Sequence, residues 1–110
     1  MKVIKAVVRP NKVKAIKDAL TACHVAGMTA IEVHGHGHQR GHSAVYRGRE
    51  YEVSLLPKMK IETVVPDDRV EGVIGVIMST TQTGEIGDGR VFVIPVEESR
   101  NIHAGERDVV

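Results

Sequence analysis

The two halves of this sequence repeat one pattern, and the repeat limits the folds open to the chain more than any other feature. A shift equal to the distance from Ile4 to Ile61 aligns apolar positions of the first half with apolar positions of the second. It places Val7 on Val64, Val8 on Val65, Val13 on Val70, Ile16 on Val73 and Leu20 on Ile77. Each half reads strand, helix, strand, so the predicted order is βαββαβ. This order is typical of an α+β, ferredoxin-like domain, in which two helices cover one face of a four-stranded antiparallel sheet.

Four segments have the composition of strands. They are residues 3–8, 29–33, 58–65 and 91–96. The first is a β-branched run that ends at Arg9-Pro10. In 58–65, apolar and charged residues alternate, which is the period of a strand with one buried face. This alternation predicts that Lys58, Lys60 and Glu62 lie on the solvent side.

The two helices are predicted between these strands. Asn11 is a candidate N-cap for the first helix, whose apolar positions recur at helical spacing: Val13, Ile16, Leu20 and Cys23. Pro66, Asp67 and Asp68 open the second helix. Its predicted inner stripe consists of Val70, Val73, Ile74, Ile77 and Met78. Gly72 and Gly75 each cost that helix about 1 kcal/mol relative to alanine, so we expect them to permit close packing.

The face of the sheet away from the helices needs a cover of its own. We expect Ile4, Ala6 and Val8 to be exposed there in a single chain. Oligomerisation is a natural way to bury them.

Composition excludes several classes of protein. The 110 residues, 42% of them hydrophobic, suit one domain. The formal charge of +1, from 15 basic and 14 acidic residues, argues against a nucleic-acid binder. Cys23 is the only cysteine, so no internal disulfide can form. The N-terminal MKVIKAVVRP does not resemble a signal peptide, and no apolar run approaches the ~20 residues of a membrane span. We therefore expect a cytoplasmic protein.

The stretch HGHGHQRGHSAVYRGREYE, residues 34–52, is part of a long connection between the second and third predicted strands. Loops of this length inside a small domain are usually functional or disordered. His34, His36 and His38 alternate, so on an extended backbone they point to the same side and could share a transition metal. An alternative is a solvated row of side chains, since no carboxylate or cysteine lies at a diagnostic spacing.

A second glycine-rich segment, TGEIGDGR at residues 83–90, comes just before the last predicted strand. The backbone amides of its three glycines could approach an anion, with Arg90 supplying charge. It lacks the Gly-Lys-Ser/Thr ending of a phosphate-binding P-loop, so an ordinary turn is an equal alternative. No serine, cysteine or carboxylate arrangement resembles a catalytic site, so we do not expect an enzyme.

Several longer motifs, taken together, resemble the PII family of nitrogen-regulatory signal-transduction proteins over residues 1–106. They are KVIKAVVRP, GMTAIEV before GHGHQRGH, YRGREY, KIETVVPDD and TGEIGDGRVFVIPVEE. The resemblance implies one domain, 1–110, that forms a homotrimer and binds ATP or ADP in clefts between subunits. With Mg-ATP it would bind 2-oxoglutarate. It also implies a T-loop at 37–56, a B-loop at 82–90 that wraps the nucleotide, and a C-terminal segment at 98–110.

The implied partners act in nitrogen metabolism. They are an ammonium channel, through which alone the protein would meet a membrane, nitrogen-metabolism enzymes, and a nucleotidylyltransferase. Tyr51 matches the tyrosine that some relatives have modified; an exposed contact residue at a loop tip is the alternative. Where other relatives carry a phosphorylated serine, this chain has Arg49.

The resemblance also implies site residues, position by position. Those implied for the nucleotide are Thr29, Gly35, Gly37, His38, Gln39, Glu62, Val64, Gly87, Asp88, Gly89, Arg90, Asn101 and His103. Those implied for 2-oxoglutarate are Gln39, Arg40, Gly41 and Lys58, and Gln39 would also ligate magnesium. A hard cation suits the amide oxygen, and a dianion suits the ammonium.

This chain departs from the family pattern around the phosphates. Relatives usually carry arginine at the positions of His38, Asn101 and His103, and lysine at that of Arg90. Neutral imidazole predominates at neutral pH, so we expect weaker discrimination for the terminal phosphate of ATP and tighter binding as pH falls toward ~6.5. The alternative is a divergent trimer that prefers ADP or AMP, or that senses a transition metal through its histidines.

Overall fold

The computed structural model describes residues 1–36, 43–46, 49–52 and 55–108. The elements in chain order are β1 (Lys2–Val8), the 3₁₀ turn η1 (Pro10–Lys12), α1 (Val13–Ala22), β2 (Thr29–Gly35), β3 (Ser43–Tyr46), β4 (Arg49–Glu52), β5 (Leu56–Val65), the 3₁₀ turn η2 (Asp67–Arg69), α2 (Val70–Thr81), β6 (Gly89–Pro95), β7 (Ser99–Asn101) and β8 (Glu106–Asp108).

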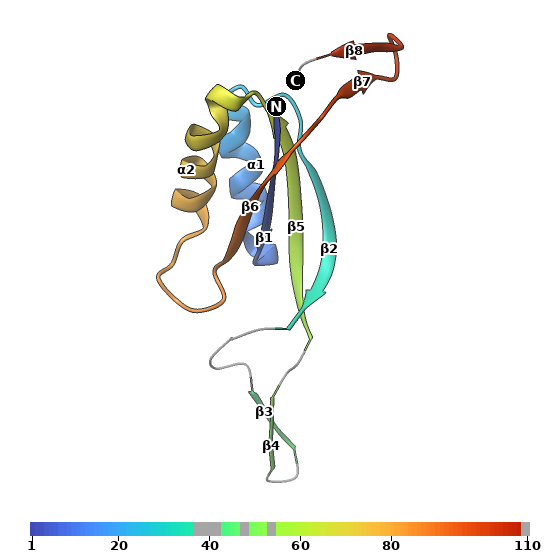
Figure 1. The fold of residues 1–110 in the computed structure, drawn as a ribbon. Helices are drawn as coiled ribbons and strands as arrows, with labels where there is room; N and C mark the ends of the chain where they lie inside the picture. The colour runs from blue at the N-terminus through green and yellow to red at the C-terminus, as the bar shows by residue number, and fades with distance from the viewer. Residues whose placement is uncertain (37–42, 47–48, 53–54, 109–110) are drawn as a thin grey trace.

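The core of the molecule is a four-stranded antiparallel sheet with α1 and α2 on one face (Figure 1). The strand order is β2-β5-β1-β6, and every neighbouring pair is antiparallel. The predicted ferredoxin-like βαββαβ fold is therefore confirmed. The strands extend beyond their predicted ends, because pairing continues through Gly35 opposite Leu56 and through Gly89 opposite Val8.

The hydrophobic core lies between the sheet and the two helices. Its fully buried members are Ile4, Ala6, Val8, Ile16, Leu20, Ile61, Val65, Val73 and Ile77. The expectation that Ile4, Ala6 and Val8 would lie on the uncovered face is wrong. Strand residues alternate between faces, and on β1 these three point toward the helices.

The helices begin and end differently from the predicted pattern. Asn11 caps nothing with its side chain, because the chain enters α1 through the turn η1. In α2, Met78 is 48% exposed, whereas Thr81, which was not part of the predicted inner stripe, is buried. Gly72 and Gly75 are exposed, and a Cβ at either position would meet nothing within 4 Å. The predictions for Asn11, Met78 and the two glycines are therefore wrong for the single chain.

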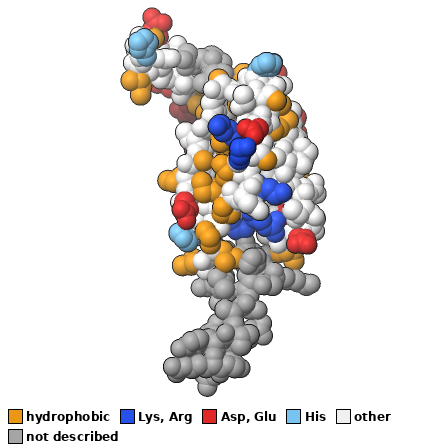
Figure 2. Space-filling model, turned by 180° about the vertical axis from the view of Figure 1, so that it is seen from behind, with side chains coloured by type: hydrophobic (Ala, Val, Ile, Leu, Met, Phe, Trp, Pro, Cys, Tyr) orange, Lys and Arg blue, Asp and Glu red, His pale blue; other side chains and the backbone are white. Residues whose placement is uncertain are grey.

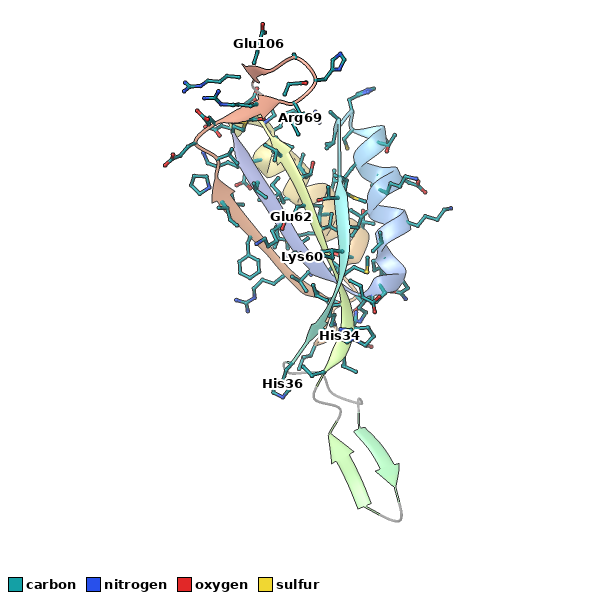
Figure 3. The ribbon with its side chains drawn as sticks, turned by 90° about the vertical axis from the view of Figure 1, so that its right-hand side faces the viewer. His34, His36, Lys60, Glu62, Arg69 and Glu106 are labelled. Atoms are coloured by element: carbon teal, nitrogen blue, oxygen red, sulfur yellow. The ribbon has the colours of Figure 1, made fainter. Side chains whose placement is uncertain are left out.

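The sheet face opposite the helices is open, and we refer to it as the open face. Its central residues are Lys5, Lys60 and Glu62, with both ammonium groups within 3.8 Å of the Glu62 carboxylate. Apolar side chains surround them: Val3, Val7, Ile31, Val33, Val64, Phe92 and Ile94. Figure 3 looks onto this face, with Lys60 and Glu62 near its centre. The open face therefore combines exposed apolar area with a compact charge cluster.

Two short hairpins project from the sheet at opposite ends (Figure 1). β3 and β4 pair beyond the ends of β2 and β5, within the predicted long connection. β7 and β8 pair beyond the end of β6, and Ile102 in the turn between them is 98% exposed. Figure 2 shows this second arm extending from a body whose surface mixes apolar with basic side chains. Within the described part of the chain, no helix is long and apolar enough to cross a membrane.

Candidate functional site

The loop between α2 and β6 is organised around one carboxylate. Asp88 accepts hydrogen bonds from the amides of Thr83 and Gly84, at 2.8 and 3.0 Å, and from the Thr83 hydroxyl. These bonds, led by that from the Thr83 side chain, together with the Arg9 guanidinium, hold the pKa of Asp88 well below its usual range. Because Asp88 and the amides of Thr83 and Gly84 are engaged inside the loop, the groups left to face a ligand are the remaining backbone amides and Arg90.

Arg9 ties this loop to the end of β1. Its Nη1 donates to the Asp88 carboxylate and, at 3.4 Å, to the Thr83 hydroxyl. Its Nη2 donates to the carbonyl of Ile86 at 3.2 Å. Arg9 was not among the predicted site residues. The pairing of Val8 with Gly89 between β1 and β6 is what brings it to the loop.

Glycine is required in this loop for two different reasons. Gly84, Gly87 and Gly89 have φ angles of 86°, 102° and 117°, which L side chains rarely adopt. At Gly89 a Cβ would also lie 2.0 Å from the carbonyl oxygen of Val7. The glycines predicted from TGEIGDGR are therefore needed for the backbone path and for close approach to β1.

Lys58 lies beside the loop and is buried. Its side chain shares the open face with Lys60, as predicted, but the residue is only 8% exposed. Its Nζ donates to the carbonyl of Gly87 at 3.0 Å, and its stem would lie 3.6 Å from a Cβ built on Gly35. Burial lowers the pKa of Lys58, Arg9 adds to the lowering, and Asp88 opposes it. The expectation of a solvated lysine is wrong.

A separate hollow of about 430 Å³ lies where β2 begins and β5 ends. It is lined by Val3, Gly27, Met28, Thr29, Glu62, Thr63 and Val64. Three of these residues are among those implied for the nucleotide: Thr29, Glu62 and Val64. The Thr29 hydroxyl donates to the carbonyl of Glu62 at 3.4 Å. The structure thus brings these three residues together.

Within one chain, this hollow and the loop at 83–90 lie apart. Thr29 is on β2 and Gly89 on β6, which are the two edges of the sheet. Three strand spacings separate them, roughly 14 Å. Asn101 and His103 are on the C-terminal arm, at the other end of the sheet from the loop (Figure 1). The Asn101 side chain accepts a hydrogen bond from the amide of Ala104 at 3.1 Å, and His103 is exposed.

The remaining predicted residues belong to the long connection. Gly37, His38, Gln39, Arg40 and Gly41 lie outside the described residues, and so does the side chain of Tyr51.

His34 and His36 are exposed at the end of β2 (Figure 3). Among the described residues, no group of three His, Cys, Asp or Glu side chains could hold a metal ion. Metal binding by the row of His34, His36 and His38 stays a prediction.

The antiparallel sheet with two helices on one face places this chain in the class of ferredoxin-like α+β domains. The family model described as "Nitrogen regulatory protein P-II" matches residues 1–106. Nitrogen regulatory protein P-II 1 of Escherichia coli (strain K12) is 48% identical over 108 residues, 98% of this chain and 96% of that protein. The P-II proteins of Haemophilus influenzae and Rhizobium etli are 46% and 43% identical over the same shares. The chain belongs to the P-II family of nitrogen regulatory proteins, as the sequence motifs indicated.

Proposed function

We propose that this nitrogen regulator is a homotrimer that binds ATP or ADP in clefts between its subunits, binds 2-oxoglutarate with Mg-ATP, and controls partner proteins through a T-loop at 37–56. The observation that carries this proposal is the division of the predicted nucleotide residues into two groups. Thr29, Glu62 and Val64 line one hollow, and residues 87–90 lie where the loop joins β6, at the other edge of the sheet. A second copy that covers the open face can supply the missing half of each site.

The open face supports this assembly. Ile31, Phe92 and Ile94 are 56%, 45% and 40% exposed there, although all are large apolar side chains. Contiguous apolar area of this kind usually marks a contact surface. The apolar side chains around the Lys5, Lys60 and Glu62 cluster would bury against the neighbouring copies.

Replacing Phe92 by aspartate is therefore expected to dissociate the assembly. The change removes a large apolar side chain from the interface and requires a carboxylate to lose its hydration there, which together cost several kcal/mol. Light scattering is expected to give a mass near 12.0 kDa for this variant and three times that value for the parent. Ala15→Glu, on the exposed side of α1, is the control and is expected to leave the mass unchanged. A trimeric Phe92→Asp variant would show that the open face is not the interface.

The loop and Lys58 suit the anionic part of the ligands. Backbone amides of a glycine loop and the exposed Arg90 can meet phosphates. Lys58 is a buried ammonium that, among the described residues, donates one hydrogen bond, to the carbonyl of Gly87. A carboxylate can take up its remaining hydrogen-bonding capacity. Together with Gln39, Arg40 and Gly41, Lys58 would hold 2-oxoglutarate, and Gln39 would also reach the magnesium ion bound to ATP.

Calorimetric titration tests the proposal directly. Chelator-treated protein is titrated with ATP and with ADP, each with magnesium, in the presence and absence of 2-oxoglutarate. We expect 2-oxoglutarate to bind only when Mg-ATP is present. If 2-oxoglutarate binds equally well without nucleotide, or if no adenine nucleotide binds, the proposal is wrong.

One observation favours an alternative in which the protein prefers ADP or AMP. The Asn101 side chain is engaged with the amide of Ala104 in its own turn. Its NH2 group is left to face a ligand, and this neutral donor offers a phosphate less than the charged guanidinium that relatives usually carry at this position. In the same titration, this alternative predicts that ADP binds as tightly as ATP or more tightly. A transition-metal sensor has no comparable support among the described residues.

The remaining parts of the proposed function concern the setting in which the protein acts. It would act in the cytoplasm by binding and not by catalysis. The T-loop would contact an ammonium channel or nitrogen-metabolism enzymes. Tyr51, on β4, is the candidate for modification by a nucleotidylyltransferase.

A further inference from the structure

We propose that Arg9 is the positioning residue of the B-loop: it holds residues 83–88 in the ligand-ready conformation before any nucleotide arrives. The inference rests on the proposed function, because it takes that loop to be the phosphate-binding element. Arg9 itself needs no contact with the nucleotide in this role.

The geometry assigns Arg9 to this loop. The chain leaves the sheet after Val8, and the Arg9 side chain, 24% exposed, turns toward the loop. All its side-chain hydrogen bonds in the described structure end on loop residues: Thr83, Ile86 and Asp88. The two ends and the middle of the loop are therefore connected through one planar guanidinium.

Arg9 also acts on the loop through its charge. Asp88 gathers the amides of Thr83 and Gly84, and without Arg9 its carboxylate would face any bound phosphate with no ion-pair partner among the described residues. Like charges at such short range repel. The guanidinium neutralises the carboxylate while leaving it as the organiser of the loop. Arg9 thus supports phosphate binding both by shape and by charge.

The fork of the guanidinium matters for this role. Nη1 donates to the Asp88 carboxylate while Nη2 donates to the Ile86 carbonyl. A lysine keeps the charge but lacks the planar pair of donors. We therefore expect Arg9→Lys to recover the charge contribution and not the holding of Ile86.

The experiment compares Arg9→Ala and Arg9→Lys with a matched control at the other end of β1. Lys2→Ala removes a cation that also bonds an aspartate, Asp67, but has no contact with the loop. The first readout is hydrogen exchange of the Thr83 and Gly84 amides in the nucleotide-free protein, followed by NMR. The second is the Kd for Mg-ATP. Thermal unfolding is recorded for each variant to establish that it is folded.

Arg9→Ala is expected to lose protection of both amides by about tenfold or more and to weaken Mg-ATP binding by about tenfold or more. Arg9→Lys is expected to fall between this variant and the parent, and Lys2→Ala is expected to match the parent in both readouts. Unchanged exchange in Arg9→Ala, or changed exchange with an unchanged Kd, would overturn the inference. If the parent protein binds no nucleotide, the proposed function fails, while the exchange data still decide whether Arg9 holds the loop.

Discussion

Gly89→Ala is expected to destabilise the protein by about 3 kcal/mol or more, because the new Cβ would lie 2.0 Å from the carbonyl oxygen of Val7. Gly89 pairs with Val8 at the start of β6, so the clash is with the neighbouring strand and not with a flexible side chain. Relief requires β1 and β6 to separate where the B-loop is attached. Urea unfolding at a fixed protein concentration measures the loss.

Gly84→Ala is the matched control, since it tests strain without the clash. Gly84 has a φ of 86°, but a Cβ there meets nothing within 4 Å. The expected cost is only the strain of a left-handed conformation, about 1–2 kcal/mol. Equal losses for the two variants would mean that the contact with Val7 does not matter.

Lys58→Met is expected to weaken the binding of 2-oxoglutarate in the presence of Mg-ATP by about 100-fold, because a buried charge pair loses one partner. The stability of the ligand-free protein is expected to change by less than about 1 kcal/mol. The variant loses the hydrogen bond to Gly87 but also the cost of burying a charge. Calorimetry and thermal unfolding measure the two effects separately.

In the parent protein, the dependence of 2-oxoglutarate binding on the charge of Lys58 is expected to appear as a dependence on pH. An ordinary lysine has a pKa of about 10.4. Burial lowers the pKa of Lys58, so its ammonium loses its proton at a lower pH than that. Since only the charged form pairs with a carboxylate, 2-oxoglutarate binding is expected to weaken as pH rises toward that value. Lys17→Met, which removes an exposed charge from α1, is expected to bind 2-oxoglutarate with the same affinity and the same pH dependence as the parent.

Full affinity for 2-oxoglutarate in Lys58→Met would exclude Lys58 from the effector site.

The fold was predictable because its signals are local. The repeat that relates Ile16 to Val73 and Leu20 to Ile77 lies in short windows of helical spacing, and all four residues are buried in the core. The glycines of TGEIGDGR were also recognisable, because positive φ angles leave a compositional trace. The errors at Asn11 and Met78 concern helix ends and edges, where tertiary contacts outweigh pattern.

The sequence by itself determined the order of the core strands and helices, the family and the set of residues available for a site. Only the tertiary structure decided which of them meet. Arg9 reaches Asp88 across most of the chain because β1 and β6 are neighbours in the sheet, and Lys58 is buried because the loop before β6 folds over it. Periodicity reports which side of an element is apolar, but pairing between distant strands determines which polar groups come within hydrogen-bonding distance.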